Sequence, residues 1–457
     1  MALSDLRSSR RRTAAVGSRA LLCVSLFLLS VMLPLGRSGH PAADSKDRAG
    51  ERALREGQYE KGLKVFLEIL KTDKENVKAE LGVATAYLKM QKYDFCFQYA
   101  EQVLKGDKNN ARAHSLVGMA LLRSGYFPNA IAELGEAIRL NPKDALAWGG
   151  LSEVDYYTNR TKEARQKAYY ASTLDSSEPD YLVTYARSSS RLEMFNEAAD
   201  AYERYLAIAP RTDMERRARI QGLIDFYRKI TGIHLHQLSG PKSVNIAFAL
   251  GADRRPYIKM RVNGRDATFV VDTGSGFTVI SDVAAKRLGV SPMAHGGTSQ
   301  GVGGNGKFAI VYGLIDSISL GEERVESVPC FIRPFHDDRN RSSNLRADGF
   351  IGLSVLSSFL TQIDYKKSVL HLDRDNPVAA NLIAVSPGVT VIPFRVTENG
   401  LISVETQLDD SHMINAILDT GASSTVVSTA AVKRLDMTDS IIKGQTADVV
   451  GAAGVSN

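Results

Sequence analysis

The sequence is poor in cysteine and tryptophan. It contains three cysteines and one tryptophan in 457 residues. Cys23 lies in the N-terminal segment, which leaves Cys96 and Cys330 in two regions of different pattern. A disulfide framework of the kind that stabilises small secreted proteins is therefore not expected. Cys96 occupies a small-residue packing position, so we expect it to belong to a core rather than to react.

The sequence also lacks a charge excess outside its N-terminus. The formal net charge is +6, and residues 1–40 account for +5 of it because they hold six arginines and one aspartate. The remaining chain is close to neutral, at +1. Proteins that bind nucleic acid usually carry a basic patch or stripe on the folded domain. We therefore expect no nucleic-acid partner.

Long hydrophobic runs are scarce as well. The longest extends from Ala20 to Leu35, and its 16 residues are short for a membrane span. It follows a basic stretch and precedes a segment of small residues, an order typical of an export signal. We interpret 1–40 as a signal peptide, or alternatively as an N-terminal anchor that tethers the chain to a membrane. Both interpretations predict an exported protein that is periplasmic, secreted or membrane-anchored and facing outward.

A 34-residue period runs through the first half of the chain. Small, apolar and aromatic residues and a proline recur at fixed positions of the units. The reference set is Gly118, Leu121, Gly125, Phe127, Ala130, Leu134, Ala137 and Pro142. The pattern resembles the tetratricopeptide repeat, a helix–turn–helix unit of 34 residues. Five repeats are expected over 43–212, in the units 43–76, 77–110, 111–144, 145–178 and 179–212. The fourth is the weakest because Asp155, Asn159 and Thr161 replace apolar or glycine residues.

The segment 213–240 should close this array. Its amphipathic part, Met214–Ile230, would cover the last repeat as a capping helix, and a linker would follow. The resemblance implies a concave surface that binds a peptide or a partner protein. The alternative is a scaffold whose groove has no dedicated ligand, since a repeat fold does not by itself define a function.

The pattern then changes to alternating apolar residues with tight turns. Tyr257–Val262 and Ala267–Val271 flank Asn263-Gly264, which predicts a hairpin. The second strand leads into Asp272-Thr273-Gly274, and the same tripeptide returns 147 positions later as Asp419-Thr420-Gly421. The surrounding residues also match, because Thr278 aligns with Thr425 and Lys286-Arg287-Leu288 with Lys433-Arg434-Leu435.

These residues resemble those of the retropepsin and pepsin family of aspartic proteases. The first lobe, 241–378, has all the expected parts: the catalytic loop, the segment Phe350, Ile351 and Gly352 that would pass behind it, and closing strands. The second, 379–457, is partial. The predicted fold class is thus a multidomain α + β protein, a helical repeat solenoid followed by an all-β retropepsin-like region with two lobes, the second incomplete.

The resemblance implies a pair of catalytic carboxylates, Asp272 and Asp419. Two close carboxylates cannot both ionise cheaply, so the pair holds one proton over a wide pH range. The ionised partner can take a proton from water while the protonated one donates to a peptide carbonyl. This chemistry needs no metal or organic cofactor, and its substrate would be a peptide or protein. The residues expected to support the two loops are Thr273, Gly274, Ser275, Thr278, Thr420, Gly421, Ala422 and Thr425.

A glycine-rich stretch in the first lobe is a candidate flap over the cleft. It covers 301–306, and its candidate residues are Gly303, Gly304 and Gly306. An ordinary glycine-rich hairpin explains the same composition.

The second lobe stops at its own glycine-rich segment, Thr446–Gly454. We expect either a fragment of a longer reading frame or missing strands that a second chain supplies. Two functional alternatives stay open beside an exported aspartic endopeptidase. One is an interaction protein whose protease region is inactive. The other is a protease that is active only as a homodimer of first lobes, through two copies of Asp272.

Overall fold

The computed structural model describes residues 41–300, 307–334, 345–374, 387–409, 412–442, 444, 449–451 and 454–456. The predicted signal at 1–40 and the candidate flap glycines Gly303, Gly304 and Gly306 lie outside these ranges. Contacts divide the chain into two units, Met1–Pro41 and Ala42–Asn457, and the description below concerns the second. Within the described ranges, every helix is too short or too polar to cross a membrane.

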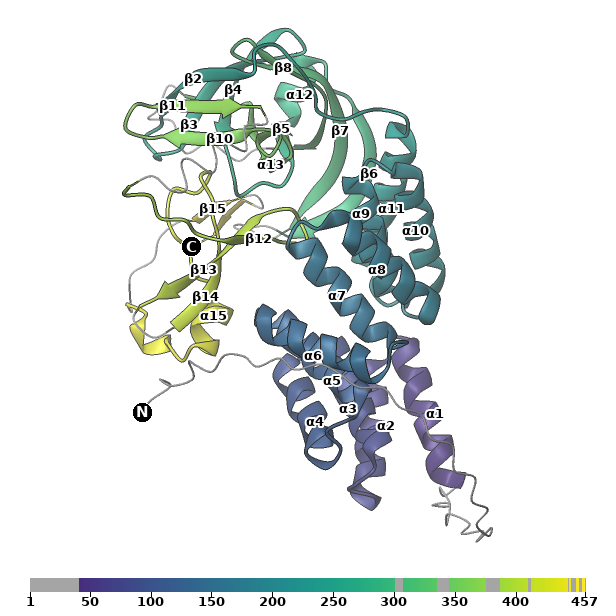
Figure 1. The fold of residues 1–457 in the computed structure, drawn as a ribbon. Coiled ribbons are helices and arrows are strands. Elements are labelled where there is room, and N and C mark those ends of the chain that lie inside the picture. The colour runs from purple at the N-terminus through teal and green to yellow at the C-terminus, as the bar shows by residue number, and fades with distance from the viewer. Residues whose placement is uncertain are drawn as a thin grey trace, which may run out of the picture. The chain divides into compact units, whose positions relative to one another are not determined.

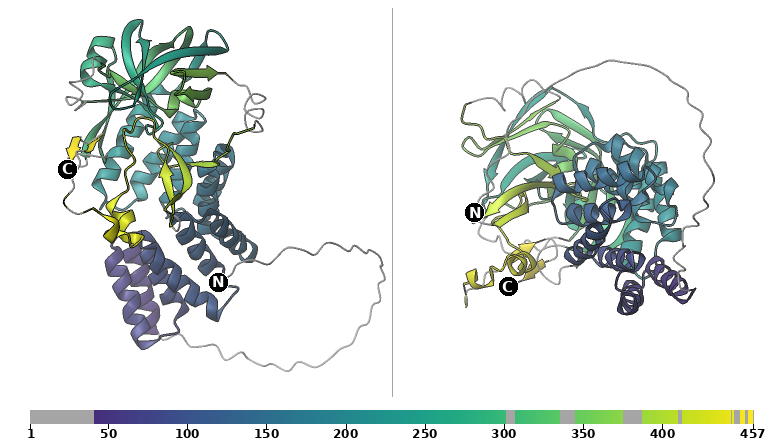
Figure 2. Two further views of the ribbon diagram at one scale, coloured as in Figure 1. Left: turned by 90° about the vertical axis from the view of Figure 1, so that its left-hand side faces the viewer. Right: turned by 60° about the horizontal axis from the view of Figure 1, so that its bottom comes forward.

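Eleven consecutive helices form the first half of this unit (Figures 1 and 2). Neighbouring helices pack against each other in chain order, and five pairs are followed by a single helix. The bounds are α1 Pro41–Arg55, α2 Tyr59–Thr72, α3 Val77–Lys89, α4 Tyr93–Gly106, α5 Ala111–Arg123, α6 Phe127–Leu140, α7 Ala145–Tyr157, α8 Thr161–Leu174, α9 Asp180–Arg191, α10 Phe195–Ile208 and α11 Met214–Ile230.

The 34-residue period is visible in how the helices begin. Asn76, Asn110 and Asp144 stand one period apart, directly before α3, α5 and α7. The side chain of each accepts a hydrogen bond from the third backbone amide of its helix, at 3.0, 3.0 and 2.9 Å. This satisfies an amide that would otherwise lack a partner within the helix. The same cap therefore starts the first helix of three successive repeats.

The fourth repeat keeps its helices although its pattern is weak. Asp155, at a position where the other repeats have an apolar or glycine residue, is buried in α7. It forms ion pairs with Lys167 and with Arg160, the latter at 2.5 Å. Buried charges are tolerated when they are paired in this way. A local ion-pair cluster thus replaces apolar packing in this repeat.

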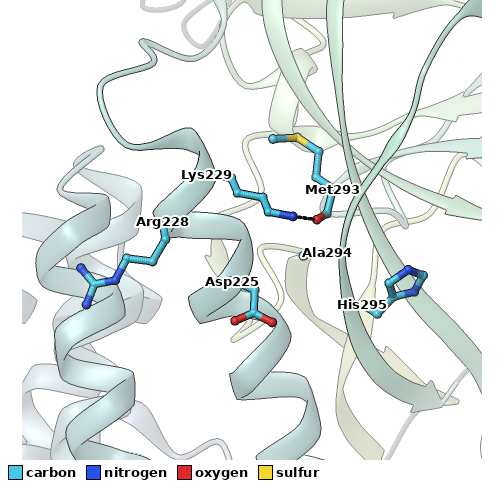
Figure 3. Close-up of a pocket in the computed structure, with 6 residues that line it drawn as sticks. All are labelled: Asp225, Arg228, Lys229, Met293, Ala294 and His295. Carbon is cyan, nitrogen blue, oxygen red and sulfur yellow. Dashed lines mark hydrogen bonds between the residues drawn. The ribbon is translucent and has the colours of Figure 1, made fainter.

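Helix α11 packs against α10 and also contacts the β-rich region. Its main contact there is with strand β6, Pro292–Gln300. A Cβ atom on Gly222 would lie 2.3 Å from the Cα atom of Gly296, so only glycine permits this approach. Figure 3 shows Lys229 extending from α11 to donate a hydrogen bond to the carbonyl of Met293 on β6. The repeat array and the β-sheet are therefore packed directly together.

The first β lobe consists of one mixed sheet. Its order is β10-β11-β2-β3-β4-β9-β5-β8-β7-β6, and β1 pairs with β8. Strand β1 lies within the stretch expected to be a linker. The bounds are β1 Gln237–Ser239, β2 Ser243–Leu250, β3 Pro256–Val262, β4 Arg265–Val271, β5 Thr278–Ser281, β7 Lys307–Leu320, β8 Glu323–Arg333, β9 Gly349–Ile351, β10 Leu360–Asp364 and β11 Val369–Asp373, with helices α12 Asp282–Leu288 and α13 Leu353–Leu356.

The sheet encloses a hydrophobic core that includes Phe269, Ile280 and Leu372. The hairpin predicted around Asn263-Gly264 is present as β3 and β4. Helix α12 begins after Ser281, whose hydroxyl accepts a hydrogen bond from the amide of Ala284 at 3.0 Å. The hairpin is the local feature that the sequence predicted.

The described part of the second lobe is smaller and more open. Strands β12 Phe394–Val396, β13 Ile402–Leu408 and β14 His412–Ile417 form an antiparallel sheet. They are followed by α15 Thr429–Arg434, a 3-10 turn at Thr438–Ser440, β15 Val449–Gly451 and β16 Gly454–Ser456. Across 387–409 and 412–442, no described hydrophobic side chain is fully buried. Of the two β lobes, only the first has a closed hydrophobic core within the described residues.

Candidate functional site

Three strands of the first lobe position Asp272. It follows β4 directly, and β9 runs parallel to β4, pairing Val271 with Ile351. The amide of Asp272 donates to the carbonyl of Ile351 at 3.0 Å. Strand β9 also pairs with β5 on its other side. Phe350 and Ile351 thus lie behind the loop that carries the carboxylate.

Gly352 continues this segment and contacts the loop with its backbone. A Cβ atom there would lie 2.3 Å from the carbonyl oxygen of Phe277 and 2.6 Å from that of Ser275. The carbonyl of Ser275 accepts a hydrogen bond from the amide of Leu353 at 2.8 Å. Because no side chain fits, glycine is required at this crossing.

Asp419 reaches the same place from the second lobe. It follows β14 after Leu418, whose amide donates to the carbonyl of Ile402 at 3.1 Å. The two Asp-Thr-Gly loops then exchange hydrogen bonds. The amide of Thr273 donates to Thr420 Oγ1 at 3.1 Å, and the amide of Thr420 donates to Thr273 Oγ1 at 3.0 Å.

Both threonine hydroxyls also donate across the pair of loops. Thr273 Oγ1 donates to the carbonyl of Leu418 at 2.7 Å, and Thr420 Oγ1 donates to the carbonyl of Val271 at 2.8 Å. Each threonine therefore donates two hydrogen bonds to the opposite loop and accepts one from it. The four hydrogen bonds fix the relative position of the residues that directly precede and follow the two aspartates.

The glycines of the two loops permit the carboxylates to meet. A Cβ atom on Gly274 would lie 2.2 Å from Asp419 Cγ and 2.4 Å from both carboxylate oxygens. A Cβ atom on Gly421 would lie 2.5 Å from Asp272 Cγ. Each carboxylate thus packs on the glycine of the other loop. The amide of each glycine donates to the carboxylate of its own loop, at 2.9 Å to Asp272 and 2.7 Å to Asp419.

The environment of Asp272 favours its protonated form. Burial, the charge of Asp419 and a hydrogen bond to Asp419 raise the pKa of Asp272 to about 7. The amide of Gly274 and the charge of Arg255 act in the opposite direction and lower it. The site is asymmetric because Asp272 is half-buried whereas Asp419 is exposed. A carboxyl group that holds its proton at neutral pH can act as a proton donor.

Two arginines near Asp272 were not anticipated from the sequence. The guanidinium of Arg255 lies 5.8 Å from the ring centre of Phe350 and pairs with Asp253 at 2.6 Å. Burial lowers the pKa of Arg333, and the negative charge of Asp272 opposes that effect. Their approach depends on the pairing of β3, β8 and β9. No short motif marks them, so only the folded sheet reveals them.

The other predicted support residues differ between the lobes. Ser275 Oγ donates to the carbonyl of Phe277 at 2.7 Å. Thr278 is fully buried, and its hydroxyl has no hydrogen-bond partner within the described ranges. Ala422 and Thr425, their counterparts in the second lobe, are exposed. The sequence match between the two half-sites therefore does not extend to equal burial.

Among the described residues, no group of three or more His, Cys, Asp or Glu side chains is placed so that it could hold a metal ion. Cys96 and Cys330 are both buried and free. The polar groups that converge at the site are thus two carboxylates, two threonine hydroxyls and backbone amides.

Comparison with known proteins gives a family match for part of the chain. Residues 258–355, from β3 to α13, match a family model described as aspartyl protease. The match includes Asp272 and ends before Asp419. The chain therefore contains an aspartyl protease-like domain. The predicted fold class, helical repeats followed by a β-rich retropepsin-like region, is confirmed.

Other similarities cover single parts of the chain. Superkiller protein 3 of Schizosaccharomyces pombe is 26% identical over 129 residues, which are 27% of this chain and 9% of that protein's length. A protein of Thermus thermophilus described as a thermophilic TPR protein is 19% identical, with a TM-score of 0.34 over 40% of this chain and 98% of that one. A retropepsin-like aspartic protease from Rickettsia conorii is 21% identical, with a TM-score of 0.23 over 31% of this chain and 97% of that one.

Proposed function

We propose that this chain is an exported aspartic endopeptidase that hydrolyses peptide bonds through Asp272 and Asp419. The observation that carries the proposal is the reciprocal packing of each carboxylate on the glycine of the opposite loop. Four hydrogen bonds between the two loops hold this arrangement. The proposal of export rests on the basic and apolar order of residues 1–40.

The reaction follows from the shared proton. Asp272, whose pKa is raised to about 7, holds the proton that the pair shares. Asp419 takes a proton from a water molecule as the oxygen of that water attacks the peptide carbonyl carbon. Asp272 donates its proton to the carbonyl oxygen, which gives a neutral tetrahedral intermediate. Asp419 then gives the proton that it took from water to the peptide nitrogen, and Asp272 takes a hydroxyl proton from the intermediate. The carbon–nitrogen bond breaks, which gives a carboxylic acid and an amine.

The helical repeats supply a second property, protein or peptide binding, which is common to folds of this kind. In this proposal the array contributes to binding rather than to the chemical step, because the site is built from the β lobes. The substrate class is a peptide or an exposed segment of a protein, and no organic cofactor is required.

The test is hydrolysis of a peptide library by the purified full chain, compared with Asp272→Asn and Asp419→Asn. Each variant removes one ionisable carboxyl group and keeps the shape of the side chain. We expect turnover to fall by at least about a thousandfold in both, because neither carboxylate can do both proton transfers alone. Glu136→Gln, which breaks a surface ion pair with Arg139 on α6, is the matched control and should keep full activity.

The two alternatives predict different results. If first lobes pair across a homodimer, Asp272→Asn abolishes turnover and Asp419→Asn leaves it unchanged. If the chain is an interaction protein with an inactive protease region, the wild-type protein binds peptides without cleaving them. Cleavage that survives Asp272→Asn would overturn the proposal itself.

A further inference from the structure

A short turn of the second lobe contacts both the repeat array and the catalytic loop. It joins β12 to β13 and consists of Thr397–Gly400, called here the Glu398 turn. Thr397 closes it, because its carbonyl accepts the amide of Gly400 at 3.0 Å and its hydroxyl accepts the amide of Leu401 at 3.0 Å. Gly400 has φ +80°, a conformation that favours glycine. Glu398 and Asn399 stand at the tip.

The carboxylate of Glu398 is held by the repeats. It forms ion pairs with Arg187 at 2.9 Å and with Arg123 at 3.4 Å, and it accepts a hydrogen bond from the hydroxyl of Tyr157 at 3.3 Å. The hydroxyl of Tyr156 donates to the backbone carbonyl of Glu398 at 3.4 Å. These residues come from α5, α7 and α9, the first helices of three successive repeats. The contacts recognise both the side chain and the backbone of one residue.

Glu398 supplies a negative charge to arginines of the repeats. Arg123 pairs with Glu153 at 2.7 Å, and Arg187 pairs with Glu398. The side chains of Arg123 and Arg187 are only 26% and 29% exposed, so a lost partner would leave a partly desolvated cation. Burial opposes ionisation of Glu398, yet the charges of Arg187 and Arg123 lower its pKa. The two arginines therefore favour an ionised carboxylate at this position.

Further contacts extend the same docking. The guanidinium of Arg395 on β12 lies 4.1 Å from the ring centre of Phe127 on α6. A Cβ atom on Gly125 would lie 2.6 Å from Asn415 Nδ2 on β14, so this turn of the repeats approaches the sheet closely. The sheet β12–β14 thus contacts the third repeat at two further places.

The opposite side of the turn touches the catalytic loop. A Cβ atom on Gly276 would lie 2.0 Å from the carbonyl oxygen of Asn399. From the turn, the chain enters β13, and the carbonyl of Ile402 accepts the amide of Leu418 at 3.1 Å, next to Asp419. A single backbone hydrogen bond therefore connects the start of β13 to the residue before the second carboxylate.

We infer that the repeat array is an intramolecular dock for the second lobe, with Glu398 as the positioning residue that sets Asp419 against Asp272. Arg123 and Arg187 of the array bind a carboxylate on a tight turn, and this chain supplies it. The open second lobe needs such an external support, because no described hydrophobic side chain of 387–409 and 412–442 is fully buried. The consequence for catalysis rests on the proposed function, whereas the docking does not.

The test measures docking without relying on activity. Hydrogen–deuterium exchange of the full chain is followed by mass spectrometry in the wild type, Glu398→Gln, Arg187→Gln and the double variant. We expect exchange in 402–418 to accelerate roughly tenfold in Glu398→Gln, because a charge-assisted contact to a partly buried cation is lost. Exchange in 256–271 should not change. The control is Glu136→Gln, which breaks the ion pair of 2.6 Å between Glu136 and Arg139 within α6.

The double variant separates docking from general destabilisation. Glu398 and Arg187 contact each other directly, so their effects on exchange should be clearly less than additive. Peptide hydrolysis gives a second reading, in which Glu398→Gln lowers kcat more than it changes KM and Glu398→Asp recovers part of the loss. Unchanged exchange in 402–418, or fully additive effects, would overturn the inference. If the wild type hydrolyses nothing but exchange responds as expected, only the proposed activity fails.

Discussion

The contact between Gly274 and Asp419 gives a sharp prediction for Gly274→Ala. The added Cβ atom would lie 2.2 Å from Asp419 Cγ and 2.4 Å from both carboxylate oxygens, whereas ordinary van der Waals contact begins at 3.4 Å. The carboxylate must therefore move by about 1 Å, and a displacement of that size in a catalytic group costs roughly a hundredfold in rate. We expect kcat/KM for peptide cleavage to fall by that factor, equivalent to about 3 kcal/mol.

The assay compares initial rates of Gly274→Ala, Gly421→Ala and Gly135→Ala with those of the wild type. Gly421→Ala repeats the test from the other side, since its Cβ atom would lie 2.5 Å from Asp272 Cγ. Gly135 lies in α6, and nothing approaches its Cβ position within 4 Å, so Gly135→Ala controls for the substitution itself. Circular dichroism establishes that each variant is folded. A folded Gly274→Ala that keeps kcat/KM within about threefold of the wild type would refute the reasoning.

Two more predictions concern stability. The pKa of Asp272 is about 7 in the folded chain and near 4 in an unfolded one, so the folded state holds the extra proton and the unfolding free energy falls as pH rises between these values. Asp272→Asn removes this fall. In urea unfolding, the unfolding free energy of the variant should therefore exceed that of the wild type by roughly 2 kcal/mol at pH 8, after allowance for partial solvent exposure, and by little at pH 4. A variant that is less stable than the wild type at pH 8 would contradict this expectation. Gly222→Ala should lower stability by about 1–3 kcal/mol because its Cβ atom would lie 2.3 Å from the Cα atom of Gly296 and 2.5 Å from the carbonyl oxygen of His295. Thermal unfolding measures this loss, and a melting temperature equal to that of Gly135→Ala would show that the α11–β6 contact adjusts freely.

Local features of the fold were accessible from the sequence because they depend on short-range patterns. The 34-residue period fixed the helix pairs, since the same small residues must recur wherever paired helices approach. The amphipathic segment Met214–Ile230 has the bounds of α11. Asn263-Gly264 marked a hairpin. The repeated Asp-Thr-Gly then indicated which two carboxylates would meet.

Contacts between distant segments were not accessible in this way. Nothing near Glu398 in the sequence indicates that Arg123 and Arg187 would hold it, because the three residues come from different helices and a turn. Arg255 and Arg333 reach the surroundings of Asp272 only through strand order. The unequal burial of Thr278 and Thr425 was also hidden, since the two positions have matching sequences. Such features depend on tertiary packing, which a local pattern does not encode.

A carboxyl titration detects the pairing of Asp272 with Asp419 by its effect on the pKa of Asp272. The full chain is labelled with ¹³C at aspartate carboxyl groups, and the Asp272 signal is assigned by its absence in Asp272→Asn. We predict that Asp272 titrates near pH 7 in the wild type, and that Asp419→Asn lowers this value while burial keeps it above the ordinary range. An Asp272 signal that titrates near pH 4, or one that Asp419→Asn leaves unmoved, would contradict a proton-sharing pair.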